Sequence, residues 1–276
     1  MTEYPKLMML HSCPFCWKVR SLLEYLKIDF NEAQLNPLRR KKSLKFAGDW
    51  GKVPIWRDSE EDFVIDSTPI MLHLDKKYNN SKLSNNDLSR QEEWLRWVDD
   101  KLSKATIPIL YGSIGSALSS TRTVSNLEKF GFFSRHIYAW TGFPIMWGII
   151  ARTRVKKDGR KPKKLWHDLL DDFVSQFDGK EFFGGNRPDI VDIAAFGIVR
   201  SISPFKQFKQ IQSHELGMKW YNAVNSTLNL LFFCSYPIVF IRFSIPPLTV
   251  LVLIPFNTIF VHGVIFVIFI IFVFIN

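Results

Sequence analysis

The sequence is poor in cysteine, which excludes a small fold held together by a dense set of disulfides. Only three cysteines occur in 276 residues, and two of them form one C-x-x-C motif. The six histidines are scattered and there is no second C-x-x-C motif, so we predict no metal site. We expect a reducing, cytoplasmic location, and no cleaved leader is visible in residues 1–6.

Acidic residues are fewer than basic ones. There are 26 of the former and 36 of the latter, which gives a net charge of +10 and favours anionic partners. The basic residues gather at 39–45 and 152–164, without the interleaved aromatic residues or metal-finger spacing that reading nucleic acid needs. We therefore predict no nucleic-acid partner, and expect a solvated or membrane-facing surface.

The first 78 residues alternate short apolar runs with amphipathic stretches. The predicted strands are 6–10, 28–34, 53–57 and 63–65. The first predicted helix follows a turn at 11–15 and runs to about residue 26, and two further helices are predicted at 38–46 and 68–78. This order, βαβαββα, predicts an α/β domain whose first two strands are parallel. Residues 79–89 are polar and predict a linker, and the helical spacing of apolar residues at 90–230 predicts an all-α domain.

The end of the chain is almost uncharged. Arg242 is the only charged residue after 228, and residues 256–275 are long and apolar enough to cross a bilayer as a helix. For the apolar tail at 231–276 two alternatives stay open, namely a membrane anchor and an artefact of the gene model without function.

The motif CPFC at residues 13–16 stands where the first predicted strand gives way to the first predicted helix. Unpaired N–H groups and the dipole at a helix start stabilise a thiolate. Cys13 is therefore the expected nucleophile and Cys16 its resolving partner, with two inert buried thiols as the alternative. Lys18 and Arg20 would add positive charge nearby, unless they point into solvent.

Two further segments could complete a thiol-binding site. A cis peptide bond before Pro54 would turn the backbone of Val53 outward to bind an extended thiol peptide, although the proline could simply begin a strand. Asp66 and Ser67 precede a predicted helix, where they could serve only as caps. Together with the N–H groups of that helix they could also bind the carboxylate and amino groups of a γ-glutamyl moiety.

Taken in order, these residues resemble the thioredoxin-like amino-terminal domain of the glutathione S-transferases and the related glutaredoxins. The resemblance implies a fold of class α/β plus all-α, with a thioredoxin-like domain at 1–78 and a helical glutathione-transferase-type domain at 90–230. The helical domain of that superfamily carries a capping motif, and NRPDIVDIA at 186–194 is similar to it. Asp189 would be the cap, and Asp192 would stabilise the first turn.

Within this superfamily the sequence most resembles the membrane-associated prostaglandin E synthases of type 2, over about residues 6–230. The matching stretches are CPFCWKVRSLLEYL, the LNP of 35–37, KVPI, the DS of 66–67, RQEEWLRWVDDKL, FFGGNRPDIVDIAAFGIVR and the KWY of 219–221.

This likeness implies that Cys13 and Phe15 stand at the reactive centre with Cys16 nearby. It places glutathione along Val53, Pro54, Asp66 and Ser67, and it adds haem as a further ligand. The tyrosine that the family has three residues before the first cysteine is replaced by Leu10, so its hydroxyl is absent here.

The leading hypothesis is a glutathione-binding, thiol-dependent transferase or oxidoreductase that uses Cys13 on a small hydrophobic or disulfide substrate. One alternative is an endoperoxide isomerase of the prostaglandin E synthase type. Another is a non-catalytic, membrane-tethered adaptor with the same fold. Pairing of two chains into a homodimer is compatible with each of them.

Overall fold

The computed structural model describes residues 5–36, 40–84, 87–129, 144, 146–148 and 152–234, and five strands beyond them. The chain divides into two compact units, residues 1–225 and 226–276, which are described separately.

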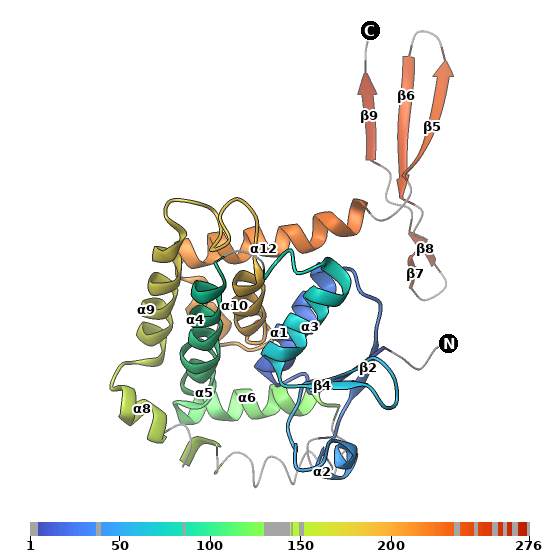
Figure 1. Ribbon diagram of the computed structural model, residues 1–276. Coiled ribbons are helices and arrows are strands. Elements are labelled where there is room, and N and C mark those ends of the chain that lie inside the picture. Colours follow the sequence, from blue (N-terminus) through green and yellow to red (C-terminus); the bar gives the residue numbers. More distant parts are fainter. Residues whose placement is uncertain are drawn as a thin grey trace. The chain divides into compact units, whose positions relative to one another are not determined.

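The first unit begins with a four-stranded sheet (Figure 1). Its strands are β1 (Lys6–Met9), β2 (Asn31–Gln34), β3 (Ile55–Arg57) and β4 (Phe63–Ile65), in the spatial order β2-β1-β3-β4. β1 and β2 are parallel, with Met8 opposite Ala33, whereas β3 is antiparallel to both β1 and β4. The parallel pairing follows from the helical crossover between β1 and β2, as the sequence predicts.

The helices of this domain are α1 (Pro14–Tyr25), α2 (Arg40–Ser43), the 3₁₀ turn η1 (Lys45–Ala47) and α3 (Ser67–Asn79). The order βαβαββα and the thioredoxin-like architecture are thus confirmed. The basic helix predicted at 38–46 is shorter in the structure, because its described part divides into α2 and η1. The second strand begins at Asn31, three residues later than predicted.

The helical region after α3 contains α4 (Leu88–Trp97), the π-helical turn η2 (Val98–Leu102), α5 (Ser103–Tyr111), α6 (Ile114–Leu127), α8 (Arg152–Asp158), α9 (Pro162–Val174), the 3₁₀ turn η4 (Ser175–Phe177), α10 (Ile190–Arg200), α11 (Phe208–Gln212) and α12 (Glu215–Cys234). At the centre lies α10, whose residues from Ile190 to Val199 are all buried. This confirms a helical second domain.

The start of α10 has a capping box. The carboxylate of Asp189 accepts hydrogen bonds from the backbone N–H groups of Val191 and Asp192, and the Asp192 carboxylate accepts one from the N–H of Asp189. Asp192 also accepts from the indole of Trp220 at 2.8 Å. Burial, with the neighbouring Asp189 charge, raises the pKa of Asp192 to about 7. Both carboxylates lie in the core and organise the helical domain.

The connection between α3 and α4 is tied to α3 by one buried carboxylate. Asp75 accepts from the amide of Asn79, from the backbone N–H groups of Leu83 and Ser84, and from the Ser84 hydroxyl. The polar composition of residues 79–89 therefore includes groups that fasten the connection. The domain boundaries themselves, at 78 and 90, stay a prediction.

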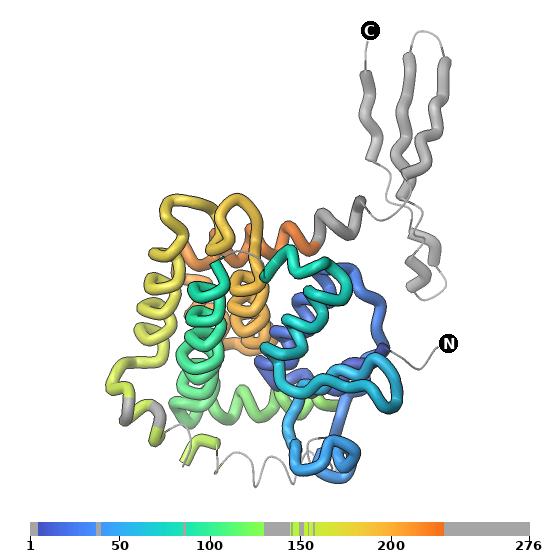
Figure 2. Tube along the Cα trace, in the orientation of Figure 1, coloured from blue at the N-terminus to red at the C-terminus, as the bar shows by residue number. Residues whose placement is uncertain are grey.

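Helices α1 and α10 pack against each other, and the course of both backbones can be followed in Figure 2. At their closest approach only glycine fits. A Cβ atom at Gly197 of α10 would lie 2.6 Å from the Cα of Lys18 and 2.7 Å from the carbonyl oxygen of Trp17. The obstacles are backbone atoms of α1, which no side-chain rotation can move away. This contact fixes α1, and with it the CPFC motif, against the helical domain.

Beyond the end of α12, the described residues of the second unit form strands, and none of them forms the membrane-spanning helix that one alternative for the tail requires. These are β5 (Ile238–Ile245), β6 (Leu248–Pro255), β7 (Ile259–Val261), β8 (Val264–Phe266) and β9 (Ile270–Phe274), with β6 antiparallel to β5 and β9, and β7 antiparallel to β8. Ile, Val and Phe favour strands, which explains the difference. Within the described ranges, no helix combines the length and apolar character that crossing a membrane would take. Membrane association through 256–275 stays a prediction.

The α1–α10 contact predicts opposite effects for two glycine substitutions. Gly197→Ala should lower the free energy of unfolding by about 2–3 kcal/mol, because the methyl group overlaps the α1 backbone. Gly115→Ala in α6 is the matched control, since a Cβ there meets nothing within 4 Å. The control should be neutral or stabilising by up to about 1 kcal/mol. Urea denaturation followed by circular dichroism measures both, and equal stability of the two variants would contradict the packing described.

Candidate functional site

Cys13 occupies the N-cap position of α1, and Pro14 follows it in the first turn. The Cys13 carbonyl oxygen accepts hydrogen bonds from the N–H groups of Cys16 at 3.1 Å and Trp17 at 3.3 Å. The Cys13 thiol is half-buried and Cys16 is buried, and both are free. The thiol of Cys13 donates to the carbonyl oxygen of Val53, with an Sγ–O distance of 3.9 Å.

The two thiols have opposite proton affinities. A hydrogen bond from Cys16 lowers the pKa of Cys13, and the backbone N–H groups of Cys16 and Phe15 act in the same direction. Burial and the Glu128 carboxylate oppose this shift. Burial, followed by the interaction with Cys13, raises the pKa of Cys16 well above its ordinary value. Cys13 is therefore the more acidic thiol of the pair, and a hydrogen bond from Cys16 favours its ionised form.

Of the two segments expected to bind a thiol peptide, the one at Val53 lies beside this thiol. The Val53–Pro54 peptide bond is cis. Asp66 is exposed, has a φ of 70°, and caps α3 by accepting from the backbone N–H of Ser67 at 2.7 Å. The Ser67 hydroxyl is buried and finds no hydrogen-bond partner among the described residues. A buried hydroxyl without a partner at a helix start is suited to binding an anionic group.

Lys18 connects α1, the helix that begins at the CPFC motif, to α3 and η2. Sequence reasoning did not predict this role. Its side chain is completely buried, and its Nζ donates to Thr68 Oγ1 and to Asp99 Oδ1, each at 2.7 Å. Thr68 Oγ1 in turn donates to Asp99 Oδ2 at 2.8 Å. Burial lowers the pKa of Lys18, while Asp99 opposes the shift. The alternative that Lys18 points into solvent is therefore wrong.

The three partners of this network come from three elements. Lys18 belongs to α1, Thr68 follows Ser67 in α3, and Asp99 belongs to the π-helical turn η2. Such turns are rare and often stand at functional sites. The Lys18–Asp99 ion pair, together with the hydrogen bonds of Thr68 to both residues, thus joins α1, the start of α3 and the helical domain.

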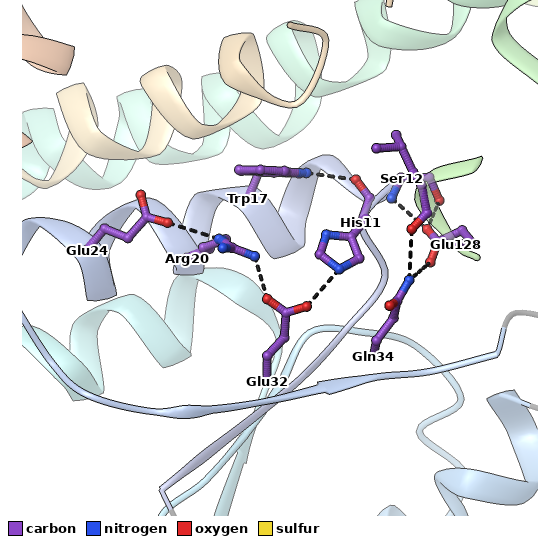
Figure 3. Close-up of polar contacts among 9 residues, drawn as sticks. His11, Ser12, Trp17, Arg20, Glu24, Glu32, Gln34 and Glu128 are labelled. Carbon is purple, nitrogen blue, oxygen red and sulfur yellow. Dashed lines mark hydrogen bonds and ion pairs between the residues drawn. The ribbon is translucent and has the colours of Figure 1, made fainter. Parts of the chain in front are cut away.

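The residues just before Cys13 are held by a second set of polar contacts (Figure 3). Glu128, which follows α6, accepts from the N–H of Ser12 at 2.7 Å and from its hydroxyl at 2.6 Å. Gln34 of β2 donates to the same carboxylate at 3.2 Å. Glu128 was not predicted from the sequence, because 116 positions separate it from Ser12 and no local pattern marks it.

On the other side of the turn, Glu32 binds His11 at 2.7 Å and also pairs with Arg20 (Figure 3). Arg20 further binds Glu24 at 2.9 Å. The positive charge of Arg20 is thus paired with the carboxylates of Glu24 and Glu32. The Trp17 indole donates to the carbonyl oxygen of His11 at 2.7 Å and fixes the turn to α1.

A cavity of about 430 Å³ opens beside Cys13. Its lining consists of Ser12, Cys13, Pro14, Phe15, Asp99, Ser103, Lys104, Thr106, Ile107, Leu110, Tyr111, Val124, Met146, Ser201 and Phe205. Phe15 and Cys13 therefore share a cavity with residues of the helical domain, while Cys16 does not line it. A larger space of about 580 Å³ is lined mainly by α3 and α4 residues, and Asp99 faces both.

The described residues offer little for a metal. No group of three or more His, Cys, Asp or Glu side chains in them could hold an ion. Haem would need an axial ligand, and the cavity lining contains three side chains of the kinds that serve in this way, Cys13, Tyr111 and Met146. Haem therefore stays a prediction from resemblance.

Comparisons with known proteins agree with the fold. Residues 7–82 match the family model described as glutathione S-transferase, N-terminal domain. Prostaglandin E synthase 2 from Danio rerio is 27% identical over 259 residues, with 77% of this chain and 68% of that protein covered. The protein of the same name from Mus musculus is 22% identical, with 76% and 66% covered.

Residues 7–82 thus match the glutathione S-transferase amino-terminal domain, and the chain has the glutathione S-transferase-like fold. It spans about two thirds of the length of its relatives named prostaglandin E synthase 2. Among solved structures, glutathione S-transferase III in its apo form has a TM-score of 0.57 at 12% identity, with 83% of this chain and 96% of that chain covered. Glutathione transferase F7 from Populus trichocarpa has a TM-score of 0.56 at 11% identity, with 83% and 98% covered.

A further superfamily structure is glutathione S-transferase-I bound with lactoylglutathione. Its TM-score is 0.55 at 12% identity, with 82% of this chain and 100% of that chain covered. At these identities the solved structures establish the fold.

The thiol pair predicts the pH dependence of Cys13 alkylation. The rate with iodoacetamide should rise with pH to a midpoint below the ordinary cysteine value of about 8.5, because the thiolate is stabilised. Cys16→Ala should raise this midpoint by about one pH unit, since a donor worth about 1.4 kcal/mol is lost. Cys16→Ser should keep it low, because the hydroxyl still donates.

Glu128→Gln should lower the same midpoint further, because the opposing charge disappears. Mass spectrometry of the Cys13 peptide separates its alkylation from that of Cys16. An unperturbed midpoint in the parent protein, unchanged by Cys16→Ala, would contradict this account of the thiolate.

Proposed function

We propose that this protein binds glutathione and uses Cys13 for thiol transfer to and from a small hydrophobic or disulfide substrate. The single observation that carries the proposal is the position of the Cys13 thiol at the start of α1, 3.9 Å from the Val53 carbonyl oxygen. A helix start and a neighbouring thiol donor suit a thiolate, and the adjacent Val53 backbone can pair with a thiol peptide.

Glutathione binding is supported by two side chains at the start of α3, those of Asp66 and Ser67, that can form further hydrogen bonds. The γ-glutamyl carboxylate would bind the Ser67 hydroxyl, which has no partner among the described residues, and the exposed Asp66 would bind the amino group. The backbone of Val53, next to Pro54, would pair with the cysteinyl part of the peptide. This arrangement directs the glutathione thiol towards Cys13.

The reaction proceeds as two balanced exchanges. The Cys13 thiolate attacks one sulfur of the substrate disulfide, so a mixed disulfide forms and the other sulfur leaves as a thiolate that takes up a proton. Glutathione, after losing its thiol proton to solvent, attacks the substrate sulfur of that mixed disulfide. A glutathione mixed disulfide then leaves, and the Cys13 thiolate is restored. Cys16 keeps its proton and donates to Cys13 throughout.

Glutathione-dependent reduction of a disulfide tests this function. Cys13→Ser should reduce turnover to the rate of the uncatalysed exchange, because the attacking sulfur is gone. Cys16→Ser should retain turnover, since its hydroxyl still donates to the thiolate. Undiminished activity of Cys13→Ser would refute the proposal.

Glutathione binding at Ser67 can be tested separately from the thiol transfer at Cys13. Ser67→Ala should raise the KM for glutathione about 10-fold, which corresponds to a hydrogen bond to a charged group of about 1.5 kcal/mol. Ser21→Ala is the matched control, because the Ser21 hydroxyl is also buried without a partner but stands on α1, outside the start of α3. Equal KM values for the two variants would exclude Ser67 as a glutathione contact.

A second candidate function is isomerisation of a prostaglandin endoperoxide. The relatives named prostaglandin E synthase 2 favour it. Leu10 stands against it, because the hydroxyl of the tyrosine expected there is missing. Purified protein incubated with the endoperoxide should give the E-type product, and a product mixture identical to that in buffer would exclude this activity.

A further inference from the structure

The basic segment around α2 is held only loosely by the fold. Figure 1 shows α2 at the outer end of the connection between β2 and β3. None of the four residues of α2 is buried. The helix is barely one turn long and ends where the N–H of Leu44 donates to the carbonyl oxygen of Arg40 at 3.0 Å. Opening this turn removes no α2 side chain from the core, so it costs little free energy.

The other basic segment is held firmly where it enters α9. That helix has 13 residues, and Lys163 and Lys164 belong to its first turn. The side chain of Trp166 follows directly, is completely buried, and donates to the carbonyl oxygen of Ala105 at 3.0 Å. Unwinding this turn would pull the indole out of the core, which is costly. Of the two basic segments, the one around α2 is therefore the one that can extend from the fold at low cost.

Ser43 is the last residue of α2, and its side chain is exposed. It directly follows four basic residues, at 39–42, whereas no other serine or threonine in the sequence directly follows even two. An extended serine behind a row of cations fits an enzyme groove lined with carboxylates, because opposite charges steer the segment in and fix its register.

We propose that Ser43 is a phosphorylation site for protein kinases with an acidic substrate groove. The Ser43 hydroxyl oxygen attacks the γ-phosphorus of a nucleoside triphosphate, and the bond between that phosphorus and the β,γ-bridging oxygen breaks. Nucleoside diphosphate leaves, and a carboxylate of the kinase takes the hydroxyl proton. This modification is independent of the thiol chemistry proposed for Cys13.

The modification acts on the charge of the segment. A phosphate brings a charge of about −1.5 to −2 into residues 39–45, which contain five basic side chains. Arg40 stands three residues before Ser43, and its Nε has no hydrogen-bond partner among the described residues. A guanidinium binds phosphate oxygens strongly, so Arg40 can hold the new group. Phosphorylation thus weakens the attraction of this surface for other anions.

Phosphorylation of the full, folded chain tests the proposal. The probe is the catalytic subunit of cyclic-AMP-dependent protein kinase, an acidic-groove enzyme, with magnesium and ATP. Mass spectrometry should find phosphate on Ser43, and Ser43→Ala should remove it. Ser59 is the internal control, because it is also exposed but lies between Asp58 and Glu60. It should be modified at least about 100-fold more slowly, since like charges in the groove repel it.

Three results would overturn the proposal. They are the absence of phosphate on Ser43, equal rates at Ser43 and Ser59, and modification of Ser43 only after the chain has been heat-denatured. The last would show that the fold withholds this serine.

Two double variants separate local recognition from net charge. Arg40→Gln combined with Lys41→Gln should lower the kcat/KM of the kinase for Ser43 by about 10- to 100-fold, because two ion pairs with the groove are lost. Lys161→Gln combined with Lys163→Gln removes the same charge from the other basic segment and should leave kcat/KM unchanged. An unchanged value in the first variant, or an equal loss in both, would refute recognition through residues 39–42.

Limited proteolysis tests the opening of α2 directly. Trypsin cuts after lysine and arginine and needs an extended segment, so its rate follows the population of the opened form. In the folded chain, cleavage within 40–45 should be at least about 10-fold faster than cleavage after Lys163 or Lys164, and in urea the two rates should become similar. Faster cleavage after Lys163 or Lys164 in the folded chain would overturn the accessibility on which the proposal depends.

Discussion

The position of α1 against α10, at Gly197, is the constraint on which the thiol site depends. Backbone touches backbone there, so α1 cannot slide or rotate without breaking the core of the helical domain. The CPFC motif is the first turn of that same helix. The sulfur of Cys13 is therefore positioned by a contact about one turn along its own helix, and the close packing of protein interiors makes this positioning rigid.

Polar contacts then bring distant parts of the chain to the thiol. Glu128 holds Ser12 from the end of α6, and Lys18 binds both Thr68 and Asp99. The cavity beside Cys13 is lined largely by the helical domain, while the groups proposed for glutathione belong to the thioredoxin-like domain. The two substrates would thus meet where the domains join, and each domain would select one of them.

Much of the fold follows from local patterns. The strand order, the CPFC turn at a helix start and the capping pair Asp189 and Asp192 depend on residues close together in the sequence, so they could be predicted. The burial of Lys18 and the role of Glu128 depend on partners 81 and 116 positions away, which no single sequence reveals. In the tail, an apolar run without polar periodicity fits a helix or a strand, and the abundance of β-branched residues favours the strands observed.

The partner of the buried lysine of the thioredoxin-like domain lies outside that domain. Asp99 belongs to η2, beyond the connection that follows α3. A chain cut within that connection would lose α10, which covers α1 at Lys18, and would leave the ammonium with the Thr68 hydroxyl but without its counter-charge. The match to the family model ends at residue 82, short of this aspartate. Fusion of the first domain to a different helical partner would consequently require a new anion at the same place.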